Sequence, residues 1–210
     1  MFIAFKQVKV FLIIILFTSS IIGNLSAQWL NANPGAGGQL QHVVCDPNIT
    51  GRMYLCSDME GYYVSDDFGT HWTYKGWEAP FSSTFNIAVE PKNSNRLYLT
   101  STQGLAITND AGKTWKVVNQ FENISIATIS VNPNNANIVC FAESWLESVV
   151  GRKNGIGEIH FSLNKGETWE SSTFINYTAN KNVYSINFKA IHMIHNIWKC
   201  FEVICKHFYY

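Results

Sequence analysis

Hydrophobic residues in this chain gather in short segments that alternate with polar turns. Each of three proline turns stands between two such segments, and the segments are rich in β-branched and aromatic residues. Segments of this length and composition, bounded by Pro and Asn, predict β-strands, and no helical pattern competes with them between the two ends of the chain. The segment pairs are 43–45 and 53–55 around Pro47, 87–89 and 97–99 around Pro91, and 129–131 and 139–141 around Pro133.

A second repeated phrase, Ser/Thr-x-Asp/Asn-x-Gly-x-x-Trp, follows each segment pair. Its side chains suit a tight turn, because Asp or Asn accepts hydrogen bonds from nearby backbone N–H groups and Gly adopts a positive φ. The Trp is expected to open the next strand and to carry apolar surface into a core. The third copy has Asn164, which cannot replace an ionised catalytic carboxylate, so the phrase predicts a structural turn. The shared positions are Ser65, Asp67, Gly69 and Trp72; Thr108, Asp110, Gly112 and Trp115; and Ser162, Asn164, Gly166 and Trp169.

These phrases define a repeat of about 43 residues, and the third copy carries an insertion. Each unit reads as four short strands, and a period of about 40 to 50 residues with four strands per unit is typical of a β-propeller blade. The sequence therefore predicts an all-β propeller of four-stranded blades, incomplete at about three blades and the start of a fourth. The propeller region is predicted at 28–190, with blades at about 38–77, 83–120 and 125–175 and the next one starting at 182–190.

Over residues 37–190 the chain resembles the BNR or Asp-box repeat propellers, a group that includes sialidases, sortilin-type receptors and xyloglucan-active enzymes. Its opening blade resembles glycoside hydrolase family 74, the xyloglucanases, through Gly37-Gly38 and the stretch Tyr54-Leu55-Cys56-Ser57-Asp58-Met59-Glu60-Gly61-Tyr62-Tyr63. That resemblance implies that Asp58 is the general base of an inverting glycosidase. Cys56 and Glu60 depart from the family pattern, which has Arg and Gly there. The alternative interpretation of Asp58 is a turn-forming Asp that stabilises its own loop.

Inverting hydrolysis also needs a second carboxyl group about 6.5–9.5 Å from the first. The resemblance places that acid in a later blade, beyond this chain, and Glu60 lies too near Asp58 along one loop to act across a sugar ring. We therefore expect the chain alone to be inactive. Two functions stay open: a polysaccharide-active protein of the xyloglucanase type, and a noncatalytic sortilin-type propeller that binds protein or glycan.

Three further residues are candidates for substrate binding. Trp77 follows a fourth strand and is expected on the same face as the Asp58 loop, where its ring would stack on a sugar. Trp145 and Arg152 lie in the third-blade insertion, between 143 and 157, and would line a cleft. Ordinary loop packing is the alternative for each of them.

The N-terminus predicts export from the cytoplasm. Lys6 and Lys9 precede the apolar run 10–17, and small and polar residues follow up to Ala27, which is the pattern of a signal peptide over 1–27. The alternative is an uncleaved anchor, but an apolar core of about eight residues is short for a membrane span of about 20. We expect a secreted, periplasmic or extracellular protein with no membrane contact after cleavage.

The charge and aromatic content of the chain limit the classes of partner that it is expected to bind. The formal net charge is 0 and 14% of residues are charged, so no basic field favours nucleic acid. The 14% of aromatic residues suits a polysaccharide or glycan, and a protein partner stays open.

Cys45, Cys56 and Cys140 are predicted as small core residues. No disulfide is expected between Cys45 and Cys56, since strand pairing about Pro47 sets Cys45 opposite Met53.

The end of the chain departs from the repeat. Residues 191–210 contain no Gly, Pro, Asp, Ser or Thr, and we interpret them as an aberrant or truncated tail. The alternative is a genuine short chain that completes its ring by association. The spacing of the tail residues His192, His195, Cys200, Cys205 and His207 matches no zinc pattern, so no metal and no cofactor is expected.

Overall fold

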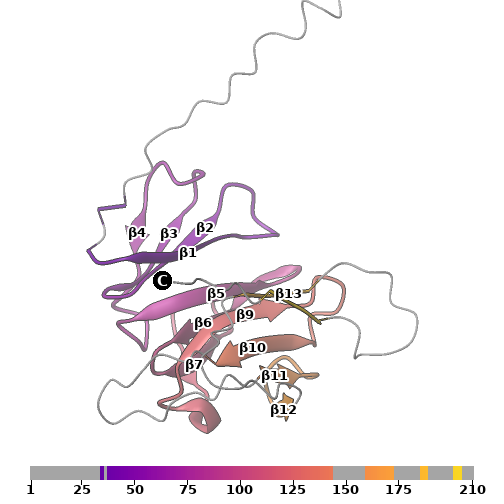
Figure 1. Cartoon of the computed structure of the whole chain (residues 1–210). Helices are drawn as coiled ribbons and strands as arrows, with labels where there is room; N and C mark the ends of the chain where they lie inside the picture. The colour runs from indigo at the N-terminus through magenta and orange to yellow at the C-terminus, as the bar shows by residue number, and fades with distance from the viewer. Residues whose placement is uncertain (1–33, 36, 144–158, 173–184, 189–200, 205–210) are drawn as a thin grey trace, which may run out of the picture. The chain divides into compact units, whose positions relative to one another are not determined.

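The computed structural model describes residues 34–35, 37–143, 159–172, 185–188 and 201–204. The described strands form three four-stranded antiparallel sheets and one two-stranded sheet (Figure 1). In each four-stranded sheet, consecutive strands are neighbours, as expected when short turns join antiparallel strands.

The first sheet contains β1 (Leu40–Cys45), β2 (Met53–Ser57), β3 (Gly61–Ser65) and β4 (Thr73–Tyr74). The second contains β5 (Thr84–Glu90), β6 (Asn93–Ser101), β7 (Gly104–Thr108) and β8 (Lys116–Val117). The third contains β9 (Ile126–Val131), β10 (Val139–Glu143), β11 (Ile159–Ser162) and β12 (Glu170–Ser172). A 3₁₀ turn, Asn119–Phe121, connects the second and third sheets.

The two-stranded sheet pairs β13 (Ser185–Phe188) with β14 (Phe201–Ile204). β13 lies beside β9 and β10 of the third sheet. Part of the segment interpreted as an aberrant tail therefore pairs with the strand that precedes it.

Two hydrophobic clusters join the three sheets. One contains buried residues of the first and second sheets, and the other contains buried residues of the second and third. Because side chains alternate across a strand, the second sheet contributes Ile87 and Leu99 to the first cluster and Ala88 and Tyr98 to the second. A sheet buried on both faces explains why β5, β6 and β7 are almost continuously apolar where they lie in the core.

The repeated turns, which we define as 65–72, 108–115 and 162–169, have the same local structure. In each, the Ser or Thr hydroxyl accepts a hydrogen bond from the Gly N–H, at 2.8, 3.1 and 2.8 Å. The Asp or Asn side chain accepts the backbone N–H four residues on, at 2.8, 2.9 and 2.9 Å. Not only the Gly but also the residue before it has a positive φ, namely Phe68 (58°), Ala111 (59°) and Lys165 (60°).

The tryptophans of these turns differ in burial, which corrects the expectation that each one enters a core. Trp169 is 8% exposed and belongs to the cluster between the second and third sheets. Trp115 is half-buried against the cluster between the first and second sheets, and Trp72 is half-buried outside both clusters. Trp115 and Trp169 thus each pack toward the sheet that precedes their own. Trp72 has no such partner, because no described sheet precedes the first.

The strand pairing of Cys45 is as predicted, but its burial differs from the prediction. Cys45 pairs with Met53, and Cys45, Cys56 and Cys140 are all free thiols. Cys56 and Cys140 are buried, but Cys45 is exposed, so the prediction that it is a core residue is wrong. Its side of β1 is not covered by another described sheet.

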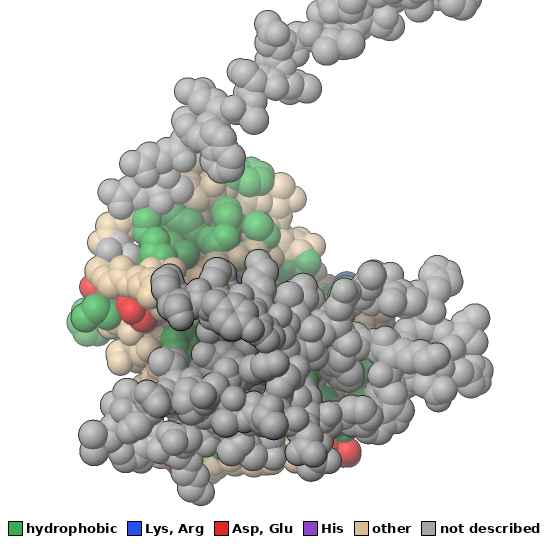
Figure 2. Space-filling model, viewed as in Figure 1, with side chains coloured by type: hydrophobic (Ala, Val, Ile, Leu, Met, Phe, Trp, Pro, Cys, Tyr) green, Lys and Arg blue, Asp and Glu red, His purple; other side chains and the backbone are tan. Residues whose placement is uncertain are grey.

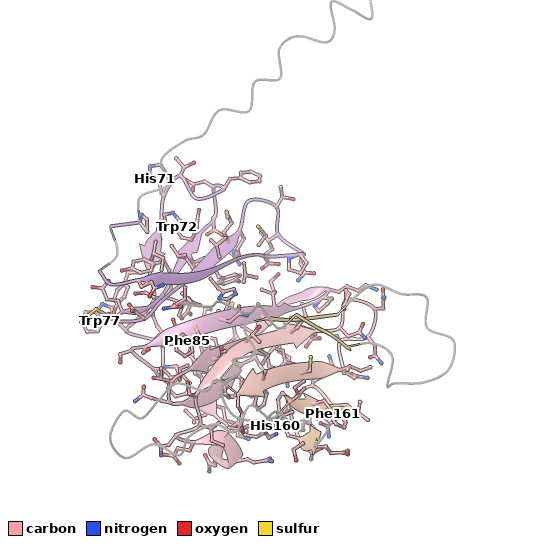
Figure 3. The ribbon with its side chains drawn as sticks, in the orientation of Figure 1. His71, Trp72, Trp77, Phe85, His160 and Phe161 are labelled. Atoms are coloured by element: carbon pink, nitrogen blue, oxygen red, sulfur yellow. The ribbon has the colours of Figure 1, made fainter. Side chains whose placement is uncertain are left out.

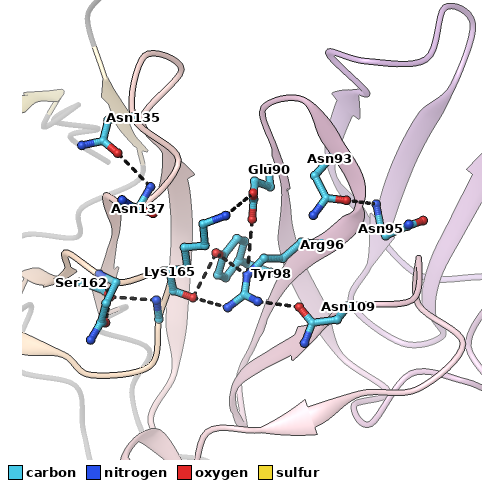
Figure 4. A network of polar contacts seen from close by, with 12 residues as sticks. Glu90, Asn93, Asn95, Arg96, Tyr98, Asn109, Asn135, Asn137, Ser162 and Lys165 are labelled. Carbon is cyan, nitrogen blue, oxygen red and sulfur yellow. Dashed lines mark hydrogen bonds and ion pairs between the residues drawn. The ribbon is translucent and has the colours of Figure 1, made fainter.

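Polar contacts tie the third repeated turn to the second sheet (Figure 4). The Lys165 ammonium lies 2.7 Å from Glu90, whose other oxygen is 3.5 Å from the Arg96 guanidinium. Arg96 also donates to the Lys165 carbonyl at 2.5 Å, and so does the Tyr98 hydroxyl at 3.1 Å. Glu90 is only 4% exposed, and its pairing with two cations offsets the cost of burying a carboxylate.

The carboxylates of the first two repeated turns should make the stability of the fold depend on pH in the acid range. Hydrogen bonds from Thr114 and Thr108 lower the pKa of Asp110 to about 2, and those from His71, with a smaller one from Ser65, do the same for Asp67. Because both pKa values are lower in the folded state, this stabilisation is complete above the unfolded value of about 3.9 and is lost as pH falls through about 2.

We therefore expect Asp110→Asn to have a melting temperature that falls less between pH 4 and pH 2 than that of the wild type. Asn164→Asp is the matched reverse change and should steepen the fall. Thermal denaturation followed by circular dichroism across this range makes the measurement. If the melting temperatures of the wild type and the two variants fall equally between pH 4 and pH 2, protonation of the turn carboxylates is not coupled to folding.

Candidate functional site

The loop that joins β2 to β3 lies at the opposite end of these strands from the first repeated turn. Ser57 pairs with Gly61, so Asp58, Met59 and Glu60 form the loop. The Ser57 hydroxyl accepts the Met59 N–H at 3.3 Å and donates to the Gly37 carbonyl at 3.1 Å. The loop is thus fixed both by its own residues and by the segment before β1.

Asp58 is held against that preceding segment. Its Oδ1 accepts the Gln39 N–H at 2.7 Å, and its own N–H donates to the Gln39 carbonyl at 3.1 Å. Gly38 permits this approach, because a Cβ there would lie 2.3 Å from Asp58 Oδ1 and its φ is +78°. The Asp58 side chain is half-buried, and its Oδ2 makes no hydrogen bond within the described part of the chain. These contacts suit a turn-forming Asp, and they leave the second carboxylate oxygen without a hydrogen bond from the described residues.

Glu60 has a different environment. It accepts the Gly37 N–H at 3.2 Å and the Tyr63 hydroxyl at 2.5 Å. The Tyr63 hydrogen bond, and after it the Gly37 one, lowers the pKa of Glu60 below its ordinary value. A general acid at neutral pH needs a raised pKa, so Glu60 is unsuited to that role and instead anchors the Gly37 segment.

An aromatic row leads from the sheet to the surface at this end. The rings of Tyr63 and Tyr74 are 5.4 Å apart, and those of Tyr74 and Trp77 are 5.8 Å apart. Trp77 is 88% exposed. Gly61 lies close to the backbone of Gly76, which brings the segment after β4 to the Asp58 end, and Figure 3 shows Trp77 at one end of the first sheet with His71 and Trp72 at the other. The expected placement of Trp77 and Asp58 at one end of the sheet therefore agrees with the geometry.

The remaining two candidates, Trp145 and Arg152, lie outside the described residues. Glu143 and His160, which lie before and after their insertion, form a buried pair, with Glu143 Oε1 2.9 Å from His160 Nε2. The His160 ring stacks on Phe141 at 4.7 Å between centroids. Sequence reasoning missed this pair and also the roles of Tyr63 and Tyr74. The only signal for the pair was a Glu and a His at strand positions where the other two repeats have uncharged residues.

Neither a metal cluster nor a membrane helix is found in the described ranges. No three His, Cys, Asp or Glu side chains gather there as metal ligands. No helix among these residues is long and apolar enough to cross a membrane.

Successive four-stranded antiparallel sheets, each packed on the next, define this chain as a β-propeller protein with three described blades. Its propeller is similar to that of an ancestral GH74 enzyme, with 35% sequence identity over 78% of this chain and a TM-score of 0.65. The chain spans 22% of that enzyme's length. No family model matches the sequence, and neither does any curated protein.

Two further GH74 proteins share the fold. The GH74 xyloglucanase from Xanthomonas campestris is 14% identical over 71% of this chain, with a TM-score of 0.52. The GH74 enzyme of Niastella koreensis is 21% identical over 71% of this chain, also with a TM-score of 0.52. This chain covers 24% of each of them.

Proposed function

We propose that this chain is the polysaccharide-binding first part of a secreted, xyloglucanase-type propeller. The observation that carries the proposal is the first blade, where Asp58 and the exposed Trp77 lie at one end of the sheet. The chain as a whole is 35% identical to an ancestral GH74 enzyme over 78% of its residues. An exposed indole at the same end of a sheet as a carboxylate suits a sugar, whose apolar face stacks on the ring while its hydroxyl groups donate to the carboxylate.

In an intact enzyme, Asp58 would serve as the general base. Its Oδ1 is oriented by the Gln39 N–H, and its second oxygen is available to accept a proton from water. Glu60 does not supply the acid, because its hydrogen bonds stabilise the ionised form. The second carboxyl group must therefore come from another part of the ring, and the chain alone binds glycan without cleaving it.

The alternative is a noncatalytic propeller that binds glycan or protein. The observation that favours it is that Asp58 also bonds the backbone of its own region, as the turn residues Asp67 and Asp110 do. In that case Asp58 stabilises a loop, and binding depends on the aromatic row alone.

A binding measurement with Trp77→Ala tests the glycan site. We expect the affinity for xyloglucan oligosaccharides, measured by isothermal titration calorimetry, to fall about tenfold when the stacking surface is removed. Phe68→Ala is the matched control, because Phe68 is 73% exposed but lies on the first repeated turn at the opposite end of the sheet. Absence of binding by the wild type, or equal losses in both variants, would contradict the proposed site.

A further inference from the structure

The loop that carries Asp58 is held at both of its ends by one residue of the second sheet. Thr84 is the first residue of β5, and its hydroxyl accepts the Ser57 N–H at 3.3 Å. The same hydroxyl lies within donating distance of two carbonyl oxygens, that of Ser57 at 3.2 Å and that of Gly61. Because Ser57 and Gly61 are the paired residues on which the loop closes, a single side chain contacts both ends of the loop.

The hydroxyl group of Thr84 stands where the other repeats have apolar side chains. Counted back from the proline of each repeat, the equivalent residues are Leu40 and Ile126. Thr84 is 0% exposed, and a buried hydroxyl costs free energy unless it is hydrogen-bonded. Its hydrogen bonds to Ser57 and Gly61 meet this need, so they tie the polar group to the loop and not to the apolar core.

The chain that leads into Thr84 also contacts the loop. The Gly61 N–H donates to the Ser82 carbonyl at 2.6 Å. A Cβ on Gly61 would lie 2.9 Å from the Gly76 Cα, so the segment between β4 and β5 packs directly on the loop. This segment carries Trp77. The loop and the exposed indole therefore meet at Gly61, where Thr84 holds the backbone.

The other side of the loop is where Asp58 accepts the Gln39 N–H at 2.7 Å. The loop thus lies between Thr84 of the second sheet and the segment before β1. Figure 2 shows hydrophobic and acidic side chains at the surface at this end of the first sheet, where Figure 3 labels Trp77. Since Asp58 directly follows Ser57, a displacement of the held end of the loop displaces the carboxylate as well.

We propose that Thr84 is a positioning residue of the glycan site, which holds the Asp58 loop and the Trp77 segment in one arrangement through Ser57 and Gly61. The inference rests on the proposed function, because the spacing of these two groups matters only to a bound sugar. A sugar that stacks on the indole reaches the carboxylate only at one spacing, and a displacement of about 1 Å weakens such a site. The second blade thus supports a site whose contacting residues belong to the first.

Amide hydrogen exchange in the full chain, followed by NMR, tests the positioning without sugar. The Gln39 N–H reports on Asp58, because that carboxylate accepts it. Thr84→Val removes the hydroxyl and keeps the shape of the side chain. We expect the Gln39 amide of this variant to exchange about tenfold faster, because the loop opens more often. Thr84→Ser keeps a hydroxyl and should return the rate to that of the wild type.

Thr100→Val is the matched control. Thr100 is also 0% exposed, and its hydroxyl also bonds a backbone N–H and a carbonyl, but both belong to Asn86. This variant should leave the Gln39 exchange rate unchanged even where its melting temperature falls as far as that of Thr84→Val. The proposal is overturned if Thr84→Val leaves the Gln39 rate unchanged, or if both variants raise it equally, because Thr84 would then act on general stability alone.

Isothermal titration calorimetry with xyloglucan oligosaccharides measures the effect on the site itself. We expect the affinity to fall about fivefold in Thr84→Val and to recover in Thr84→Ser, while Thr100→Val binds as the wild type does. A wild type that binds no sugar overturns the proposed function, and with it the role of Thr84 in a sugar site. A wild type that binds sugar no more tightly than Thr84→Val overturns the role of Thr84 alone.

Far-UV circular dichroism shows whether each variant is folded. If Thr84→Val is not, Thr84→Ala takes its place in both measurements, with Thr100→Ala as its control. The same outcomes then support or overturn the proposal.

Discussion

Asp58→Asn should lower the rate of glycan hydrolysis by about 10²- to 10⁴-fold once residues 37–143 are placed in a complete enzyme. A chimera provides that setting: residues 37–143 replace the equivalent segment of the ancestral GH74 enzyme, to which this chain is 35% identical. The loss is expected because an inverting enzyme without its base cannot activate the attacking water. Reducing-end release from xyloglucan measures the rate.

Sugar binding and melting temperature should change little in the same variant, since Asn keeps an oxygen for the Gln39 N–H. Asp67→Asn in the chimera is the control, because this carboxylate lies in the first repeated turn at the opposite end of β3. An Asp58→Asn chimera that is fully active but melts earlier would assign Asp58 to the loop alone. A parent chimera that cleaves no glycan would favour the noncatalytic propeller.

Trp169→Ala should lower the free energy of unfolding by about 3–5 kcal/mol, through loss of buried apolar surface and creation of a cavity. The Trp169 ring is 8% exposed and lies 5.0 Å from Phe141 and 5.7 Å from Phe121. Its indole N–H donates to the Gly166 carbonyl at 3.0 Å, so the substitution also removes a hydrogen bond that closes the turn. Urea denaturation with and without the substitution gives the difference.

Trp72→Ala is the matched comparison, because Trp72 has the same place in its repeat but lies outside both clusters. We expect a distinctly smaller loss for this variant. Equal losses would mean that the tryptophans act through their own turns and not through the neighbouring sheet.

The sequence predicted the strands and turns because their signals are local. Apolar segments such as 87–89 and 97–99 fall within β5 and β6, and the Cys45–Met53 pairing follows from a turn of fixed length about Pro47. The spacing of these signals also predicted the four-stranded sheets, since a repeat of about 43 residues has room for four short strands. The placement of Asp58 and Trp77 at one end of the first sheet follows from the same strand order.

Other properties depend on contacts between distant residues and could not be read from any local pattern. Gly37 donates its N–H to Glu60, and Gly38 leaves room for the Asp58 side chain, only because the chain folds back over about twenty residues. After the hydrogen bond from Tyr63, the one from Gly37 lowers the pKa of Glu60 further. The His160–Glu143 pair likewise forms across an insertion.

The sequence by itself determined the repeat, its strands and its turns, since hydrogen bonds and side-chain periodicity act over a few residues. Only the tertiary structure decided which of the equivalent residues are buried. Trp72, Trp115 and Trp169 occupy the same place in their repeats, as do Cys45 and Val89, yet their burial differs. The physical reason is that burial belongs to the packing of one sheet on the next, and the first sheet has no described sheet before it.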